Sequence, residues 1–501
     1  MFKLRGWEPV RALCVVVLFL AAPASASPWV EVGEQGLRND IEILANHGII
    51  GSLLTTWPVP WAQVSAQLPP IDGDADLPAY VRQSLKRVRK RMKKETAASK
   101  FSGALVTRLA SEPALVRDFA TTGRDGIDTR VRLEYMGKST AFRFGVGLQG
   151  DANFDDPDIE FDDSYFASTA ANWLLYGGVI DHWWGPGEVS SLILSNNSRP
   201  FPRIGIMRNN PTAFEAPWLR WIGPWQLHAF VGVLDDDGRE VDNTLFIGGR
   251  LTLNPIDGLE LGVAGTLMIC GDGLPCNLAA FKDALFRGED QAGAATNSNG
   301  LAAWDFRYTS RLRTSPFTLY GQMINEDFAS LNDGLFGHIS YLGGMTTWGP
   351  LRNDGALWRL TTEFSRTRAT FNHGTAGNNL TYNHNTYRSG YRYHGRSLAH
   401  SLDNDSLLFS LVATLTDIRD WTYRLAYHRA EINRDGSVLG SRLGKPLSTS
   451  AEDINLVEAG ISVPLRAGSL EFEFRLQDNK PDTPGKDEFE AAMELGWTFR
   501  F

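Results

Sequence analysis

The last stretch of the chain, Glu490–Phe501, constrains the fold more than any other. Its apolar residues occupy every second position, which is the period of an extended strand with one apolar face. They are Met493, Leu495, Trp497, Phe499 and Phe501. In an open sheet this strand would be an aggregation-prone edge, because its backbone amides have no partner. A closed barrel removes the edge, and lipid around the barrel makes apolar-out, polar-in alternation a requirement on every strand.

The same alternation recurs from Phe101 onward, for example in Arg130–Tyr135 and Leu470–Gln477, where the polar faces carry charges that suit a water-facing lumen. Short turns such as Gly137–Ser139 alternate with longer polar connections such as Asp151–Asp163. With one strand on each side of each turn, we count about 18 antiparallel strands. The sequence therefore predicts an all-β transmembrane barrel over residues 101–501.

The terminal Phe501 and its aromatic ladder are similar to the C-terminal signature of bacterial outer-membrane barrels. This similarity implies three partners: the barrel-assembly machinery, which would contact Phe501, outer-membrane lipid, and lipopolysaccharide.

The N-terminus has the pattern of a secretory signal peptide over residues 1–26. Lys3, Arg5 and Arg11 precede an apolar run, and small residues at 24–26 form a cleavage site. The run is too short for the alternative, a transmembrane anchor. The mature chain would begin at Ser27, and we expect the signal peptide to direct it through the inner membrane.

Residues 27–100 are predicted to form a small periplasmic helical domain. Apolar residues fall at helical spacing in two places. They are Leu37, Ile41 and Leu44, and then Val81, Leu85, Val88 and Met92. The second helix carries a basic run over Lys86–Lys94, which would bind anionic lipid, an acidic polymer or a partner, or simply face solvent. We favour the solvated face.

Residues 185–217 do not fit a simple hairpin. The segment is long and contains several prolines, which cannot donate to a strand ladder. We expect it to fold into the lumen or to cap it, as a plug.

Composition limits the possible partners. The formal net charge is -9, and removal of the basic signal peptide makes it more negative. This balance argues against nucleic acid as a partner. In the mature chain only Cys270 and Cys276 remain, within a turn-rich segment that lacks further metal ligands. In an oxidising compartment we expect a disulfide between them rather than a metal site.

Motifs for chemistry are weak. The glycines of Gly145–Gly150 match a dinucleotide-binding pattern but lie in an alternating strand, so no cofactor is predicted. Asp151, Asn153 and Asp155 have the spacing of calcium ligands, but the loop lacks the usual glycine and glutamate, and a solvated acidic loop is favoured. No zinc-protease, hydrolase-elbow or P-loop motif occurs, so we predict no catalytic residue and no metal site.

Aromatic and hydrogen-bonding residues collect outside the strands, in 182–184 and 371–400. Rings stack on the apolar faces of sugars, and arginine binds carboxylates, so these residues suit an acidic polysaccharide. The candidates are His182, Trp183, Trp184, Tyr382, His384, Tyr387, Arg388, Tyr391, Arg392 and Tyr393. Interfacial anchoring or packing of the loops on themselves would explain the same aromatics equally well.

Two stretches, 28–64 and 177–225, resemble the Wzi-type capsule assembly proteins. The resemblance implies an outer-membrane barrel of eighteen strands, a periplasmic helical bundle, a plugged lumen and surface-exposed loops. It also implies a lectin-like, non-enzymatic role in which the protein anchors capsular polysaccharide or exopolysaccharide to the cell surface. A porin-like channel for small solutes is the alternative, and a surface hydrolase is a third possibility.

Overall fold

The structure is a computed structural model. It describes residues 29–51, 53–69, 76–97, 100–150, 159–236, 238–286, 298–310, 316–326, 338–352, 354–371, 376–434, 447–482 and 487–501. The predicted signal peptide and the candidate calcium ligands Asp151, Asn153 and Asp155 lie outside the described residues.

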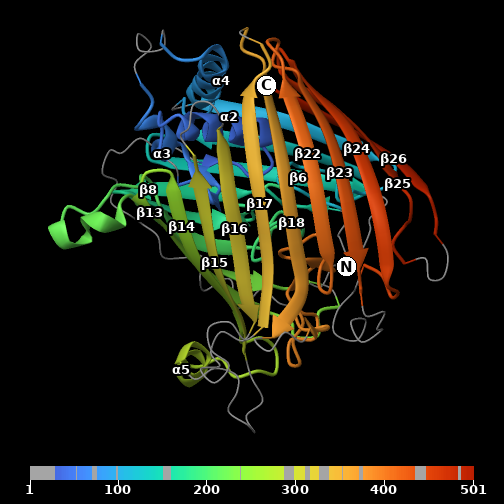
Figure 1. The fold of residues 1–501 in the computed structure, drawn as a ribbon. Coiled ribbons are helices and arrows are strands. Elements are labelled where there is room, and N and C mark those ends of the chain that lie inside the picture. The colour runs from blue at the N-terminus through green and yellow to red at the C-terminus, as the bar shows by residue number, and fades with distance from the viewer. Residues whose placement is uncertain are drawn as a thin grey trace.

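Eighteen antiparallel strands close into one barrel, which confirms the predicted strand number (Figure 1). The strands are β4 (Lys100–Ala110), β5 (Ile127–Met136), β6 (Thr140–Gly150), β8 (Tyr165–Ala170), β9 (Trp173–Gly178), β11 (Arg203–Arg208), β12 (Trp225–Leu234), β13 (Thr244–Ile256), β14 (Leu259–Ile269), β15 (Ser298–Thr309), β16 (Phe317–Glu326), β17 (His338–Pro350), β18 (Leu357–Phe371), β22 (Leu407–Thr416), β23 (Thr422–Ile432), β24 (Glu452–Leu465), β25 (Gly468–Gln477) and β26 (Glu490–Arg500). Two short strands, β7 (Ile159–Glu160) and β19 (Ala376–Gly377), extend the wall.

The last strand, β26, closes the barrel by pairing with β4, from Glu494 opposite Ala110 to Arg500 opposite Ala104. Its aromatic and aliphatic face is exposed on the outside, whereas Ala492 and Glu494 are buried inside. The edge that a terminal strand would otherwise leave is therefore paired, and the outer face is apolar as lipid contact requires.

The barrel has two different ends, which we call the helix end and the loop end. At the helix end, neighbouring strands are joined mostly by short turns, such as residues 137–139 between β5 and β6. This end also carries the helices α2 (Gln35–Asn46), α3 (Trp61–Ser65) and α4 (Ala79–Glu95) and the C-terminus (Figure 1). The loop end carries the longer connections and helix α5 (Leu278–Phe286).

The helices predicted in residues 27–100 are present as α2 (Gln35–Asn46), α3 (Trp61–Ser65) and α4 (Ala79–Glu95). They come with three two-residue strands, β1 (Trp29–Val30), β2 (Thr56–Trp57) and β3 (Val59–Pro60). No helix among the described residues is long and apolar enough to cross a membrane.

These helices do not have a core of their own. Their buried residues, such as Ile41 and Leu85, belong to one cluster with Trp183, Trp348 and Leu357 of the barrel and its interior. On α2, the buried Glu42 accepts a hydrogen bond from Arg359 of β18 at 2.8 Å. The helical part therefore closes one end of the barrel as part of the same folded unit.

Glu95, at the end of α4, makes the stability of this closure depend on pH. Burial and nearby carboxylates raise its pKa from 4.5 to about 7, although the Arg91 guanidinium opposes the shift. The carboxylates belong to Glu31, Glu34 and Glu134. Because the folded pKa is raised, the contribution of Glu95 to stability is present below about pH 4.5 and is lost as the pH rises through about 7.

We therefore expect Glu95→Gln to stabilise the protein at pH 8 by about 1 kcal/mol, less than the full value of the shift because the side chain is partly exposed. At pH 4 the variant and the unmodified protein should unfold at the same temperature. Thermal unfolding at both pH values measures the difference. The exposed Glu215 gives the control Glu215→Gln, and an equal shift in both variants would contradict the assignment.

The boundaries of the predicted plug require a correction. Residues 203–208 form β11, a strand of the wall that pairs with β9 on one side and β12 on the other. Six residues are too short for a clear alternation, so their partners in distant strands decide the structure. Gly205 in β11 makes room for Tyr176 of β9, since a Cβ there would lie 2.5 Å from its ring. The segment inside the barrel is residues 179–202, which we call the plug.

The two sides of the lumen differ in chemistry. On one side β12–β17 present apolar side chains toward the plug, among them Phe230, Phe246, Met268, Ile324 and Leu342. On the other side the wall is lined by ion pairs, for example Arg108 with Glu471 at 2.8 Å and Arg475 with Glu494 at 3.2 Å. A cavity of about 390 Å³ borders this charged side, between β4, β5 and the N-terminal residues 29–34.

Candidate functional site

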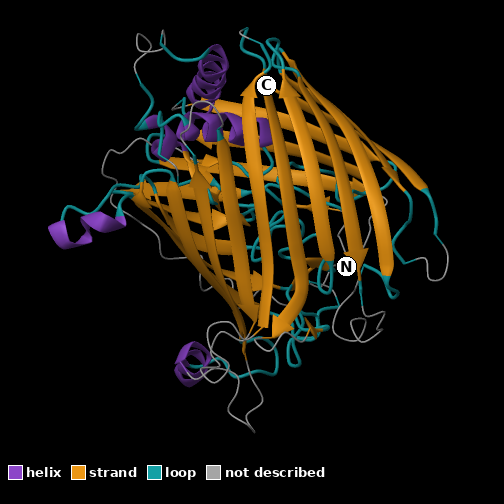
Figure 2. Cartoon of the chain, viewed as in Figure 1, coloured by secondary structure: helices purple, strands orange, loops and turns teal. Residues whose placement is uncertain are grey.

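Two segments fill the lumen toward the loop end: the plug and residues 378–406, which we call the inner loop. Loops are seen crossing the barrel interior in Figure 2. Leu192, Ile193 and Leu194 of the plug share one apolar cluster with Tyr382, Tyr387 and Tyr391 of the inner loop. The Tyr382 hydroxyl donates to the Leu192 carbonyl at 2.8 Å, and the Tyr391 hydroxyl donates to the Ile193 carbonyl at 2.7 Å. The two segments therefore form one packed body.

The barrel wall holds the plug through its backbone. The carboxylate of Glu363 in β18 accepts hydrogen bonds from the backbone N–H groups of three consecutive plug residues and from the Tyr320 hydroxyl. Gln322 in β16 accepts from the Leu192 N–H and donates to the Trp184 carbonyl, both at 2.8 Å. Because backbone groups without water need partners inside the protein, these two side chains fix the path of the plug.

The sequence-predicted residues 182–184 lie in the interior. Trp183 and Trp184 form β10, which pairs with β2, and both indoles are fully buried. His182 contacts the Tyr176 hydroxyl at 3.1 Å and Arg203 at 2.8 Å. Burial and the Arg203 guanidinium hold the pKa of His182 well below its usual range, so its ring is neutral and does not attract an acidic sugar.

Five of the predicted residues in the inner loop are buried as well: Tyr382, Tyr387, Tyr391, Arg392 and Tyr393. Arg392 is held by Asp403, with Nε 2.6 Å from the carboxylate. Eight of the ten candidates are thus enclosed by protein in this structure, where a buried ring cannot stack on a polymer at the surface and the buried Arg392 is already paired with Asp403. This placement corrects the prediction of surface sugar contacts for these eight residues. It agrees with the alternative interpretation, in which the loops pack on themselves.

The remaining two candidates, His384 and Arg388, reach the surface of the inner loop. The Arg388 side chain is 58% exposed and lies 3.5 Å from Glu240, which belongs to the β12–β13 connection. Nδ1 of the half-buried His384 accepts from the backbone N–H groups of Thr386 and Tyr387, which fixes its ring. With the exposed Asn385, these side chains form what we call the outer patch: Glu240, His384, Asn385 and Arg388.

Asn385 belongs to the segment 371–400, where the sequence shows aromatic and hydrogen-bonding residues together. Glu240 could not be singled out from the sequence, because nothing local marks it among other polar loop residues. The outer patch offers one cation, one carboxylate, an amide and an imidazole, which can bond hydroxyl and carboxylate groups of a sugar.

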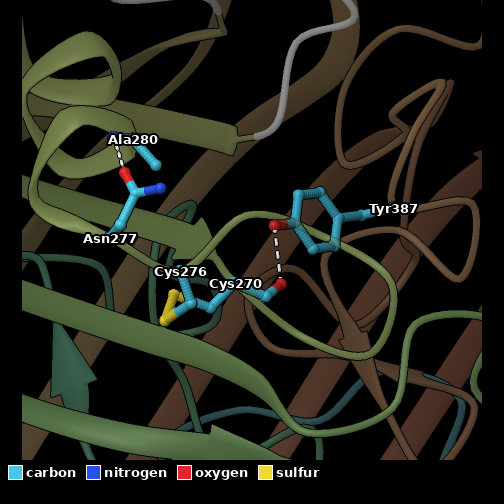
Figure 3. Close-up of a disulfide and its surroundings, with 5 residues drawn as sticks. All are labelled: Cys270, Cys276, Asn277, Ala280 and Tyr387. Carbon is cyan, nitrogen blue, oxygen red and sulfur yellow. Dashed lines mark hydrogen bonds between the residues drawn. A yellow bond between two sulfur atoms is a disulfide. The ribbon is translucent and has the colours of Figure 1, made fainter.

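A disulfide joins Cys270 and Cys276 next to the inner loop, with an S–S distance of 2.10 Å (Figure 3). The Tyr387 hydroxyl donates to the Cys270 carbonyl at 2.9 Å. At the start of α5 the Asn277 side chain accepts from the Ala280 N–H at 3.0 Å. Residues 270–276, at the start of the connection after β14, are therefore held to the inner loop through Tyr387.

Metal binding has no support in the described part of the chain, where no group of three His, Cys, Asp or Glu side chains lies close enough to hold an ion. Two acidic side chains that follow the candidate calcium loop, Glu160 and Asp162, are instead paired with Arg199 at 3.1 and 2.9 Å.

Comparison with known proteins gives the family. The family model of the capsule assembly protein Wzi matches residues 99–488. An uncharacterized 55.8 kDa protein in the cps region of Klebsiella pneumoniae is 29% identical over 360 residues, which cover 70% of this chain and 67% of that protein. The solved structure of Wzi from Escherichia coli matches with a TM-score of 0.79 at 22% identity, over 94% of this chain and 99% of that one.

That Escherichia coli protein is an outer-membrane protein involved in group 1 capsule assembly and a carbohydrate-binding β-barrel. At this identity the structural match establishes the fold, and the family match spans nearly all of the barrel strands. This chain belongs to the Wzi family of capsule assembly proteins.

Proposed function

We propose that this protein is a non-enzymatic, lectin-like protein of the outer membrane that anchors acidic capsular polysaccharide or exopolysaccharide to the cell surface. Membership of the capsule assembly family supports the process, and the carbohydrate-binding β-barrel of Escherichia coli Wzi supports the class of ligand.

The filled lumen carries the proposal. Plug and inner loop occupy the barrel interior as one packed body, and the plug is bonded to the wall at Glu363 and Gln322. A barrel closed in this way leaves its outer surfaces for contact with a polymer. The same observation opposes the second candidate function, a channel for small solutes, because solutes would have to pass through the packed cluster.

The arrangement of the connections supports an orientation. In outer-membrane barrels the short turns lie in the periplasm and the longer loops lie outside the cell. We therefore place the helix end, with α2–α4 and the C-terminal Phe501, in the periplasm and the loop end at the surface. In this orientation Phe501 is available to the barrel-assembly machinery. The apolar wall contacts phospholipid in the leaflet at the helix end and lipopolysaccharide in the leaflet at the loop end.

The outer patch is our candidate for the polymer contact. The chain as a whole carries a net charge of -9, which repels an acidic polymer. The exposed guanidinium of Arg388 at the loop end offers such a polymer a local positive charge. Each contact is weak, but a polymer presents the same repeat many times and many copies of the protein share one cell surface. Retention then depends on multivalency rather than on one tight site.

The experiment that tests the function compares cell-attached with released polysaccharide in a clean deletion strain, with total polymer measured alongside. We expect the attached fraction to fall while total output is maintained. An unchanged attached fraction would contradict the anchor. Incubation of purified protein with added polymer tests the enzymatic alternative, and a fall in polymer length would overturn the non-enzymatic assignment.

For the outer patch we predict that the triple variant His384→Ala, Asn385→Ala, Arg388→Ala lowers the attached fraction several-fold, because small losses per contact multiply along a polymer. The matched control is Arg419→Ala, which removes an exposed arginine from the turn between β22 and β23 at the opposite end. Both variants should fold and reach the membrane equally. Equal retention by the two would show that the polymer binds elsewhere.

A further inference from the structure

The connection between β11 and β12 differs from the other turns at the helix end. It contains a short helix, η2 (Pro217–Ile222), which projects sideways from the wall as the green helix in Figure 1. Trp218 is 74% exposed and Trp221 is 68% exposed. Two indoles in a single turn at this exposure are unfavourable in water, because they leave a large apolar area uncovered.

The projection of η2 is fixed by contacts on both sides. The Arg208 guanidinium lies 3.8 Å from the centre of the Trp225 ring and donates to the carbonyls of Thr212 and Trp225 at 2.9 and 2.8 Å. Phe214 stacks on Trp225, with the ring centres 4.9 Å apart. The residues just before η2 are therefore held against Trp225 at the start of β12.

The exit from η2 is equally defined. Gly223 has a φ of 70°, and a Cβ at this position would lie 1.9 Å from the Asn254 carbonyl oxygen. Only glycine satisfies both conditions, so the turn that holds η2 away from the wall is built into the sequence. The exposure of the two indoles therefore follows from the path of the backbone through this turn.

The surroundings of η2 are those of a membrane surface. The helix packs beside β13, whose exposed Ile256 lies at the same end, and Trp173 of β9 lies 6.4 Å from Trp225. Farther along the wall, Ile204 of β11 and Val231 of β12 pair with each other and are exposed on the outside. The indoles therefore continue the apolar outside of the barrel beyond its rim. Arg220 stands between them and is exposed.

We propose that η2 is a lipid anchor, which places Trp218 and Trp221 in the interfacial zone of the phospholipid leaflet at the helix end, with Arg220 at the phosphate level. Indoles favour this zone because one side of the ring is apolar and its N–H can bond polar groups. A phospholipid surface fits better than a protein partner, because the patch is continuous with a wall that lipid already covers. Since η2 lies on one side only, it fixes the tilt of the barrel and hence the height of the loop end.

The test places an environment-sensitive fluorophore on a single cysteine introduced at position 221, in protein reconstituted into phosphatidylcholine vesicles. The two mature cysteines are held in the disulfide, so the label is specific. The control probe replaces Lys138, an exposed residue in the β5–β6 turn at the same end. We expect the probe at 221 to shift to shorter wavelength and to lose most of its fluorescence to lipids with a quencher near the headgroup, while the probe at 138 responds to aqueous iodide.

Quenching of the 221 probe by iodide, without quenching by lipid, would overturn the anchor and indicate a surface for a protein partner. A second measurement uses Trp218→Ser with Trp221→Ser, which removes only exposed side chains and should leave the barrel folded. Polarised infrared spectroscopy measures the tilt of the reconstituted barrels, and the distribution of tilt angles should be broader in this variant. An unchanged tilt distribution would also count against the proposal.

Discussion

Glu363→Ala is expected to convert a closed barrel into a conducting one. The Glu363 carboxylate accepts from the N–H groups of Glu188 and Ser190 at 2.7 Å and of Val189 at 3.2 Å. Without it three buried donors lose their partner, at about 1–3 kcal/mol each if water does not replace it. Water can enter only if the plug moves away from β18, and this movement opens the lumen.

Single-channel recording in planar bilayers measures the effect. The unmodified protein should be silent, and Glu363→Ala should show openings. The matched control is Glu471→Ala on β25, which removes a lumen carboxylate bonded to Arg108 and not to the plug. Steady conductance of the unmodified protein would contradict the closed lumen and would favour the channel function instead. Silence of both variants would show that Gln322 and the tyrosines hold the plug without Glu363.

Alternation made the wall predictable from the sequence. Leu495 and Trp497 face outward and Glu494 faces inward, as their positions in the strand require. The rule failed for β11, because Arg203–Arg208 has only six residues, includes a glycine and follows a proline-rich segment. Its strand character comes from pairing with β9 and β12, which no local pattern reveals.

The candidate site was harder to predict for a different reason. A ring that stacks on a sugar and a ring that fills a lumen have the same local signature, an aromatic residue among polar neighbours. Tyr391 is buried because its hydroxyl meets the Ile193 carbonyl, about two hundred residues earlier in the chain. Sequence spacing does not contain this contact. Arg388 remains at the surface, where its guanidinium lies near Glu240 of the β12–β13 connection.

The interior pairs also explain how the helix end is attached. Glu260 of β14 accepts from the backbone N–H groups of Leu54 and Thr55 at 2.9 and 3.1 Å. Arg250 of β13 donates to the hydroxyls of Thr56 and Thr55 at 2.8 and 2.7 Å. The N-terminal residues around β2 are therefore bonded to the wall by side chains of adjacent strands, and β2 in turn pairs with β10 of the interior.

Arg250→Ala is expected to be strongly destabilising, by about 3–5 kcal/mol, because it leaves the carboxylate of Asp305 buried without a counter-charge. Both side chains are fully buried and lie 2.7 Å apart. Thermal unfolding measures the loss of stability, with the heat-modifiable mobility of the barrel on gels as the readout. Limited proteolysis should show cleavage near β2 before the barrel opens, since the same substitution removes the bonds to Thr55 and Thr56.

A double replacement separates the charge from the packing. Arg250→Met with Asp305→Leu removes both charges and keeps apolar volume, so it should cost much less than either single change. The pair of the exposed Arg419 with the half-buried Asp417 gives the surface comparison, where Arg419→Ala should not change the unfolding temperature. If Arg250→Ala were as harmless as Arg419→Ala, water would have to reach Asp305, and the packing around β2 would be looser than these contacts require. If the double variant were as unstable as the single one, the bonds to Thr55 and Thr56, rather than the charge pair, would hold the N-terminal segment in the barrel.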